Sequence, residues 1–394
     1  MNNFLLWNLN ENASEQHANR LASTVVPKSH TLALNNAPNA YVIFARSDDS
    51  DTILDKLRTR LNDCNLKEET YLTAYNKIPA FVWFRHINEY DDTIQKYYYS
   101  IKCFSISRLL NIDCICDKYQ LYINMQKYFP DTYLQFMPKS FKLENETQFT
   151  ANGVFIARPI NELETKFRCH SGNGICVYDS EPTLIDVKET MLNKYDTIIV
   201  SEYITNPLLF KKKKMHLRCY MYVTIINNLY SGYVYDDHKI YTASNEYVSR
   251  DFQNKNIHDS HGHNVSCFID GFSENFTSEN VGHVMNENVI EKIHNDIREI
   301  GKKMAIIFKD KAKCPPNAKN AFHLFGFDIL IDENFKVYLL ECNRFCQMTN
   351  IRSNVDFYDQ FFNWVNDVIL TPLFHNDNKI NASMMNTPVY SCQL

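Results

Sequence analysis

The chain has 394 residues, of which 45% are apolar and 22% charged, and its formal net charge is −5. This length allows two or three domains with a large core, and the composition is that of a soluble globular protein. The slightly acidic balance gives no reason to expect nucleic acid as a partner. Only 9 residues are glycine, so each glycine is informative.

Three features of the sequence indicate a cytoplasmic location. The 12 cysteines do not show the paired C-x₂-C spacing of a zinc site. The first residues, MNNFLLWNLNENASEQ, lack the basic segment of a signal peptide. No 18-residue apolar stretch predicts a membrane span. We therefore expect a cytoplasmic protein with reduced thiols and no membrane partner; the sequence does not indicate an oligomeric state.

The first part of the chain, residues 1–115, is predicted to form an N-terminal α/β domain. Two short apolar runs, 41–44 and 80–84, are typical of buried strands. Residues 91–111 show a weak helical pattern rich in aromatic side chains.

Residues 116–200 alternate between helical and extended patterns, which predicts a second α/β domain. A helix is expected over 117–129, with Asp117 as its N-cap. Short strands are expected at 153–157, 175–178 and 197–203.

Residues 201–374 are predicted to form a third α/β domain, followed by a loose polar tail at 375–394. The regular elements expected in this third domain are strands at 216–226 and 229–235 and helices near 287–308 and 355–370. Between them lies a polar loop with His258, His261 and His263. Their spacing is a weak metal signal, and surface or pocket-lining histidines are the simpler interpretation.

The stretch FHLFGFDILIDENFKVYLLECN, residues 322–343, is typical of a β-hairpin that turns at Asn334-Phe335. This turn places Asp328 opposite Glu341, with Cβ atoms about 5 Å apart on one face, and Gly326 opposite Asn343. The other face is wholly apolar and is predicted to consist of Phe325, Phe327, Ile329, Ile331, Tyr338, Leu340 and Cys342. Since facing like charges destabilise a hairpin, we expect a divalent cation between the carboxylates. Oxygen ligands favour Mg²⁺ over zinc.

Two short segments could contact phosphate groups. The loop Ser171-Gly172-Asn173-Gly174 precedes a predicted strand, and its backbone N–H groups could hold a phosphate; taken alone, an ordinary tight turn is the simpler interpretation. Arg158 follows another strand, where it would either bind phosphate or lie in solvent.

A strand that starts near Lys214 would present Lys214, His216 and Arg218 on one face. The alternate residues Met215, Leu217 and Cys219 would form an apolar face, while 211–213 reads as a solvated loop. Cations, a glycine loop and a carboxylate–amide hairpin together indicate ATP·Mg²⁺ chemistry. The motifs of P-loop proteins and protein kinases do not occur.

The order of these segments resembles the tubulin tyrosine ligase-like family of the ATP-grasp superfamily, from about residue 117 to residue 343. The segment VSEYITNPLLFKKKKMHLRCYMYV, residues 200–223, is similar to the family pattern V-Q-x-Y-I-x-x-P-L-L followed by K-F-D-x-R. The hairpin is similar to F-E-x-x-G-F-D followed by L-I-E-V-N.

The resemblance implies an ATP-grasp fold, in which ATP lies between the central and the C-terminal α/β domain. It implies that Lys118 and Arg158 approach the nucleotide and that the backbone of 202–204 reads adenine. The full implied nucleotide set is Lys118, Arg158, Ser171, Gly172, Asn173, Gly174, Glu202, Tyr203, Ile204, Lys214, His216 and Arg218. The implied magnesium ligands are Asp328, Glu341 and Asn343, and the implied catalytic residues are Lys214, Arg218 and Glu341.

The resemblance also implies a reaction. ATP would phosphorylate an acceptor carboxylate, and the amine of Tyr, Glu or Gly would displace phosphate to form an amide. The implied acceptor is a protein with an acidic tail, with tubulin as the candidate.

Several positions depart from the family pattern. Arg158 replaces a lysine, His216 an aspartate and Tyr241 an arginine, while His258-Asp-Ser-His261 stands where the family has H-L-T-N. Loss of one preorganised donor can cost roughly 10²–10³ in rate. Two alternatives therefore stay open: a catalytically weak protein that binds nucleotide or an acidic tail, and an ATP-grasp ligase with a small-molecule acceptor.

Overall fold

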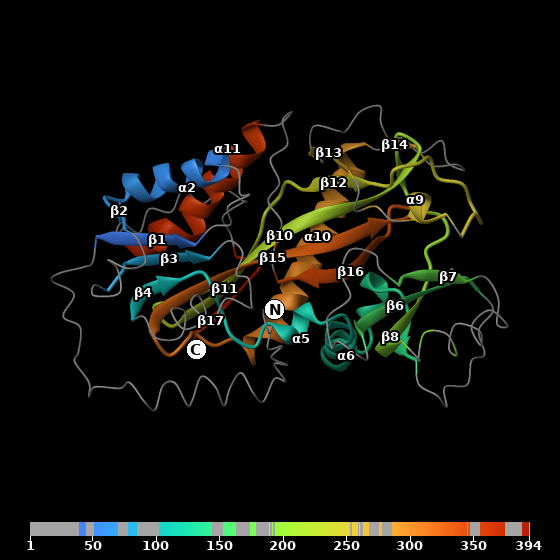
Figure 1. Ribbon diagram of the computed structural model, residues 1–394, viewed down its shortest axis with the longest axis horizontal. Helices are drawn as coiled ribbons and strands as arrows, with labels where there is room; N and C mark the ends of the chain where they lie inside the picture. Colours follow the sequence, from blue (N-terminus) through green and yellow to red (C-terminus); the bar gives the residue numbers. More distant parts are fainter. Residues whose placement is uncertain are drawn as a thin grey trace, which may run out of the picture.

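The protein is a mixed α/β structure, as the sequence predicts. The computed structural model describes residues 39–44, 51–69, 78–84, 102–143, 153–162, 174–178, 189, 191, 194–252, 254–258, 260, 263–267, 276–277, 286–344, 346, 355–374 and 388–393. Its strands form a 13-stranded sheet and a 4-stranded sheet, which lie beside each other in Figure 1. Within these residues, no helix has the length and apolar character needed to cross a membrane.

The helical elements of the described residues are α2 (Asp51–Asp63), α5 (Asp113–Cys116), α6 (Lys118–Tyr128), α7 (Tyr133–Phe136), α9 (Lys255–His258), α10 (Glu287–Lys309), α11 (Val355–Val365), the π-helical segment η2 (Asn366–Leu370) and α12 (Thr371–Phe374). The strands are β1 (Ala40–Phe44), β2 (Lys67–Glu68), β3 (Phe81–Phe84), β4 (Cys103–Ile106), β5 (Ser140–Lys142), β6 (Phe155–Glu162), β7 (Cys176–Tyr178), β8 (Tyr195–Glu202), β9 (Leu209–Phe210), β10 (Lys213–Ile226), β11 (Leu229–Val234), β12 (Lys239–Thr242), β13 (His263–Cys267), β14 (Phe276–Thr277), β15 (Ala318–Ile331), β16 (Val337–Asn343) and β17 (Tyr390–Gln393).

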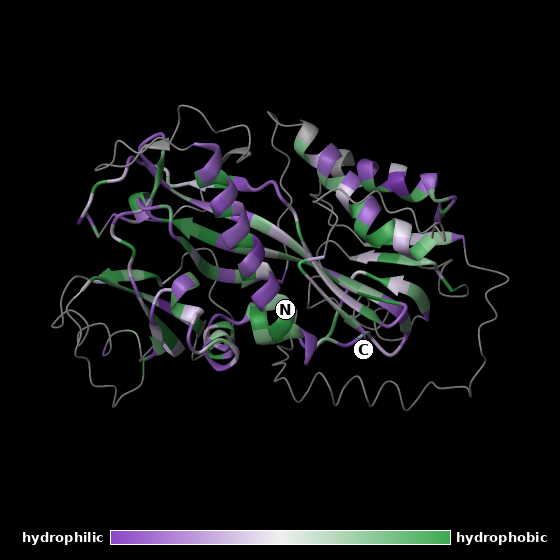
Figure 2. Cartoon of the chain, turned by 180° about the vertical axis from the view of Figure 1, so that it is seen from behind, coloured by the Kyte–Doolittle hydropathy of each residue, from purple (hydrophilic) through white to green (hydrophobic). Residues whose placement is uncertain are grey.

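Strand β10 is the centre of the large sheet. It pairs antiparallel with β11, β12 and β15, and β16 continues the sheet beyond β15. Its residues Met215, Leu217 and Cys219 are fully buried against apolar residues of α10. Helix α10 crosses that face and turns its hydrophilic side outward (Figure 2). The predicted alternation along β10 is thereby confirmed.

The opposite face of β10 is covered at one end by α11 and α2 (Figure 1). Tyr220 and Tyr222 of β10 are fully buried there among aromatic residues of α11. The polar residues of the same face therefore lie toward the other end of the strand, where β10 approaches the small sheet.

The small sheet has the order β5-β8-β6-β7 and contains strands from the stretch predicted as the central domain. Helix α6 precedes it and begins where the sequence predicts, because the Asp117 carboxylate accepts hydrogen bonds from the backbone N–H groups of Tyr119 and Gln120, both at 3.0 Å.

The helical expectation for 91–111 is wrong at Cys103–Ile106, which form β4. This strand runs parallel to β15, with Ala318 opposite Cys103 and Ala321 opposite Ile106. The weak helical pattern was outweighed here by pairing with a distant strand. Strands from both sides of residue 115 share one sheet, and the division into domains stays a prediction.

The C-terminal residues 390–393 are not part of a loose tail. They form β17, which pairs antiparallel with β11 from Leu229–Gln393 to Gly232–Tyr390. Ser231 and Ser391 hydroxyl oxygens lie 3.0 Å apart across this pair. Strand β17 therefore covers the edge of β11.

The predicted hairpin is strands β15 and β16, and its register confirms Asp328 opposite Glu341 and Gly326 opposite Asn343. The register shifts by one residue after Asp328, so that Ile329 faces Leu339. This β-bulge corrects the predicted apolar face. Val337 and Leu339 are buried in the core in place of Tyr338 and Leu340.

Candidate active site

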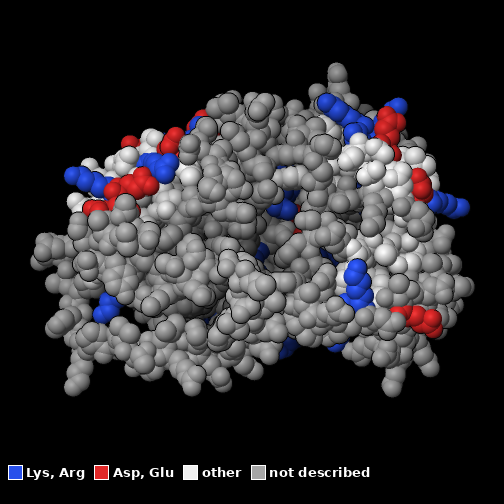
Figure 3. All heavy atoms as spheres, viewed as in Figure 1, with Lys and Arg blue, Asp and Glu red and all other residues white. Residues whose placement is uncertain are grey.

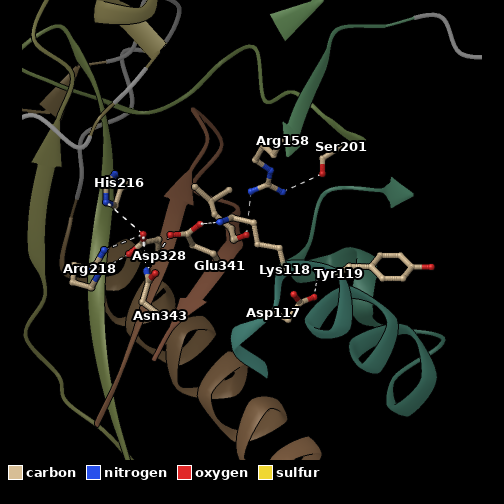
Figure 4. A network of polar contacts seen from close by, with 11 residues as sticks. Asp117, Lys118, Tyr119, Arg158, Ser201, His216, Arg218, Asp328, Glu341 and Asn343 are labelled. Carbon is tan, nitrogen blue, oxygen red and sulfur yellow. Dashed lines mark hydrogen bonds and ion pairs between the residues drawn. The ribbon is translucent and has the colours of Figure 1, made fainter. Parts of the chain in front are cut away.

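The two hairpin carboxylates and one amide converge near the C-terminal end of β16, which lies opposite Asp328 of β15 (Figure 4). The Asn343 Nδ2 atom lies 3.1 Å from Glu341 Oε1 and 3.4 Å from Asp328 Oδ2. The bulge lies directly after this group, so it leaves the three side chains together.

Arg218 of β10 neutralises Asp328. The residues are directly opposite each other in the β10–β15 pair, and the guanidinium donates to both carboxylate oxygens, with Nη2–Oδ2 at 3.1 Å. Burial opposes the charge on Arg218, but Asp328 raises the pKa of this guanidinium well above its ordinary value. This bidentate pair fixes both side chains.

Gly326 makes room for Arg218. A Cβ atom at this position would lie 2.9 Å from Arg218 Cδ and 2.8 Å from Cys346 Sγ. The glycine of the G-F-D segment therefore lets the Arg218 side chain lie against the backbone of β15.

Lys118 of α6 neutralises Glu341, with Nζ–Oε2 at 2.9 Å. Burial alone would raise the pKa of the Glu341 carboxyl, but Lys118, then Arg158 and Asn343, hold this pKa well below its usual range. Because Asp117 caps α6, the first helical residue is placed to reach the strand.

Arg158 of β6 reaches from the small sheet toward the hairpin. Its Nη1 donates to the Leu340 carbonyl at 3.3 Å, and its Nη2 donates to Ser201 Oγ at 3.1 Å. Burial lowers the pKa of Arg158 from its ordinary value, while Glu341 opposes that shift. Arg158 is thus an inward-directed cation rather than the solvated surface arginine of the alternative interpretation.

Lys214 lies at the outer end of the polar row on β10. Its Nζ donates to the Tyr203 hydroxyl at 2.9 Å and sits 4.3 Å from the centre of that ring. The Tyr203 hydroxyl in turn lies 2.6 Å from His258 Nδ1. Lys214, His216 and Arg218 are all buried, so the row faces the protein interior.

His216 occupies the middle of the row. Its Nδ1 lies 2.6 Å from Ser260 Oγ, and its Nε2 lies 3.9 Å from Asp328 Oδ2. The imidazole stacks on Tyr241, and the Tyr241 ring lies 5.6 Å from the Arg218 guanidinium carbon.

Part of the predicted nucleotide set cannot be placed. Ser171, Gly172 and Asn173, together with His261, lie outside the described residues. Gly174 is described and has φ of +75°, which favours glycine.

The predicted adenine hinge follows strand β8. Its backbone N–H groups at Glu202 and Tyr203 donate to the carbonyls of Lys139 and Val154, both at 2.9 Å. The Glu202 side chain is exposed. Within the predicted hinge, the backbone groups left to contact a base are therefore the N–H of Ile204 and the carbonyl groups.

The sequence did not indicate Ser260, the Tyr203 hydroxyl or Lys239 as polar groups of this region. Lys239 is fully buried beside Arg218 in the β10–β12 pair, and its Nζ donates to the Tyr358 hydroxyl. Its ammonium also lies over aromatic rings, 5.2 Å from the Phe357 centroid. The partners come from distant segments, so local patterns contain no signal for them.

The donor set fits magnesium. In the described part of the chain, no group of three His, Cys, Asp or Glu side chains is placed to hold a metal ion. Two carboxylates and an amide are oxygen donors of the kind that hold Mg²⁺ together with water and phosphate oxygens. In the space-filling view, basic side chains are visible within a hollow near the middle of the molecule (Figure 3).

These features define a mixed α/β protein whose acidic hairpin faces cations from three other elements. Residues 97–378 match the Tubulin-tyrosine ligase family. The chain therefore belongs to this family of tubulin amino-acid ligases, as the resemblance indicated.

Curated relatives differ in their named activities. The human "Probable tubulin polyglutamylase TTLL2" is 28% identical over 254 residues, covering 60% of this chain and 40% of that protein. The Saccharomyces cerevisiae "Probable tubulin--tyrosine ligase PBY1" is 24% identical over 273 residues, covering 60% of this chain and 35% of that protein. "Tubulin glycylase 3D" of Tetrahymena thermophila is 30% identical over 188 residues, covering 44% and 17% respectively. The chain thus spans at most about two fifths of the length of these relatives.

Proposed function

We propose that this protein is an ATP- and Mg²⁺-dependent ligase that joins the amine of an amino acid to a carboxylate on a protein acceptor. The observation that supports this most directly is the opposition of Asp328 and Glu341, each paired with a cation from a different element. Such a group can accept a metal-bound polyphosphate, because the carboxylates serve the metal and the cations serve the phosphates.

The proposed fold is an ATP-grasp, with the nucleotide between the small sheet and the β10–β15–β16 region. Lys118, Arg158, Lys214 and Arg218 would contact the phosphates, and the segment around Ile204 would meet the base. Asp328, Glu341 and Asn343 would hold Mg²⁺, which when bound neutralises the triphosphate charge during phosphoryl transfer.

In the proposed reaction, an acceptor carboxylate takes the γ-phosphoryl group of ATP to form an acylphosphate. The amine of Tyr, Glu or Gly then displaces phosphate and leaves an amide bond. Arg218 and Lys214 would stabilise the charge that develops on the transferred group. Tubulin, through its acidic tail, is the proposed acceptor, because the relatives are named for it. A cytoplasmic location is proposed on the same basis.

A second candidate function is nucleotide or acidic-tail binding with little catalysis. The observation that favours it is the His216–Tyr241 stack, which puts two stacked aromatic rings where the resemblance implies an acid and a cation. Beside this stack Arg218 still pairs with Asp328, and Asn343 still donates to Glu341, which favours the ligase.

The test is incorporation of labelled Tyr, Glu or Gly into tubulin in the presence of ATP and Mg²⁺. Glu341→Gln should abolish incorporation, whereas Glu291→Gln, on the exposed side of α10, should retain it. ATP binding without incorporation of any of the three would favour the binding protein. Absence of both ATP binding and incorporation would overturn the metal role of the hairpin.

A further inference from the structure

A chain of hydrogen bonds runs from Lys214 through two side chains to a backbone carbonyl. Lys214 Nζ is 2.9 Å from the Tyr203 hydroxyl, which is 2.6 Å from His258 Nδ1. At the far end, His258 Nε2 lies 2.7 Å from the carbonyl oxygen of Asp251. Three separate segments, the residue after β8, the start of β10 and α9, are linked in this way.

The chemistry of the end groups fixes the direction of this chain. A carbonyl oxygen can only accept, so His258 carries its proton on Nε2 and donates it to Asp251. In the neutral ring Nδ1 is then an acceptor, so the Tyr203 hydroxyl donates to it. The hydroxyl oxygen remains to accept from the Lys214 ammonium. All four groups are therefore used in one consistent orientation.

Packing holds the two intermediate rings in place. The buried Tyr203 ring makes edge contacts with His258, at a centroid distance of 5.6 Å, and with Phe252, at 6.0 Å. Burial lowers the pKa of His258 and the charge of Lys214 lowers it further, although the bond to Asp251 opposes the shift. This agrees with the neutral imidazole that the hydrogen bonds require.

We propose that His258, acting through Tyr203, is a positioning residue that aims the Lys214 ammonium at the nucleotide phosphates. This inference rests on the proposed function, which gives Lys214 a phosphate to bind. A lysine ammonium sits on a flexible stem, so fixing it before the ligand arrives reduces the entropy lost on binding. Since an ammonium has three N–H donors, the bond to Tyr203 is compatible with a phosphate contact.

The test compares binding of ATP with binding of adenosine, which has no phosphates, by calorimetry on the full chain. Tyr203→Phe keeps the ring beneath Lys214 but removes the hydroxyl, and His258→Ala removes the next acceptor. Each should weaken ATP binding about 3- to 10-fold, as expected for the net contribution of one ordinary hydrogen bond, and change adenosine binding less than twofold. His258→Gln, which retains an acceptor and a donor, should restore part of the loss.

Tyr128→Phe is the matched control, because it removes a hydroxyl that bonds Asp310 at the other end of α6. Equal weakening of ATP binding and adenosine binding would show a deformed base site and would overturn the positioning role. Unchanged ATP affinity in both variants would also overturn it. If the unaltered protein binds neither ligand, the proposed function itself fails. If the unaltered protein incorporates amino acids normally but the variants bind ATP as tightly as it does, only the positioning role is overturned.

Discussion

His216 and Tyr241 are directly opposite each other on β10 and β12, and their rings stack at a centroid distance of 5.3 Å and an interplanar angle of 6°. The two most pronounced departures from the family pattern are therefore one cross-strand pair. An aromatic stack occupies the place where the family pattern has an aspartate and an arginine, and this stack lies beside Arg218.

We expect these two positions to be energetically coupled. His216→Asp alone would put a second carboxylate beside Asp328, and Tyr241→Arg alone would put a further cation beside Arg218. The double variant should form an opposite-charge pair and be more stable than the sum of the single changes by about 1–3 kcal/mol. Urea unfolding of the four proteins measures this coupling. Changes that add to within about 0.5 kcal/mol would show that the positions are independent.

Lys118 should matter for catalysis more than for folding, because its side chain is partly exposed while its ammonium pairs with Glu341. Lys118→Gln should reduce amino-acid incorporation by a factor on the order of 10²–10³, as for the loss of one preorganised charged donor. Lys127→Gln, in the last turn of α6, is the matched control and should keep normal rates. A Lys118→Gln protein with full activity would remove this residue from the phosphate set.

Gly326→Ala should displace Arg218, since the added Cβ would lie 2.9 Å from its Cδ atom. The crowding should cost about 1–3 kcal/mol of unfolding free energy and also reduce the rate of incorporation. At Gly153 the nearest heavy atom would be 3.7 Å away, so Gly153→Ala should change stability by less than about 1 kcal/mol. Thermal and urea unfolding of both variants compare the sites, and equal losses would contradict the role given to Gly326.

The buried His323 should make the protein less stable in acid. Burial, followed by the charge of Arg108, lowers the pKa of His323 from 6.5 to about 3, and its Nε2 lies 3.0 Å from the carbonyl oxygen of Arg344. Between these two pKa values the unfolded chain binds a proton that the folded protein does not. Stability is therefore full above pH 6.5 and falls as the pH drops toward about 3, by at most about 1.4 kcal/mol per pH unit from this group.

His323→Gln tests this origin of acid sensitivity. Glutamine can still donate to the Arg344 carbonyl but does not titrate, so the slope of unfolding free energy against pH should decrease in that window. His294→Gln serves as a comparison. Burial also lowers the pKa of His294, but this histidine lies on α10. An unaltered slope in His323→Gln would mean that other groups cause the acid loss.

Local patterns predicted the hairpin, the capped helix α6 and the two faces of β10. In each case the deciding residues lie close together in sequence, so turn position, capping and alternation determine the structure. The pairing of Asp328 with Glu341 followed from the turn alone. The bulge at Leu340 could not be predicted from the turn, because it depends on which residues of β16 fit the core.

Contacts between distant segments were harder to predict. The β4–β15 and β11–β17 pairs join residues separated by well over a hundred positions, and no periodicity in either segment specifies its partner. The resemblance assigned Lys118 to the phosphates and Glu341 to magnesium, but it did not predict that the two side chains pair directly. The hydroxyls of Tyr203 and Ser260 required the folded chain, since a lone hydroxyl in a sequence has no preferred partner.

The bulge on β16 links the two sheets mechanically. Leu340 is the residue that has no opposite partner in the β15–β16 register, and its carbonyl accepts from Arg158 of the small sheet. A rotation of the small sheet away from the large one would move Arg158 relative to this carbonyl. Because Glu341 is the next residue, opening and closing of the two sheets would act directly on the carboxylate at the centre of the site.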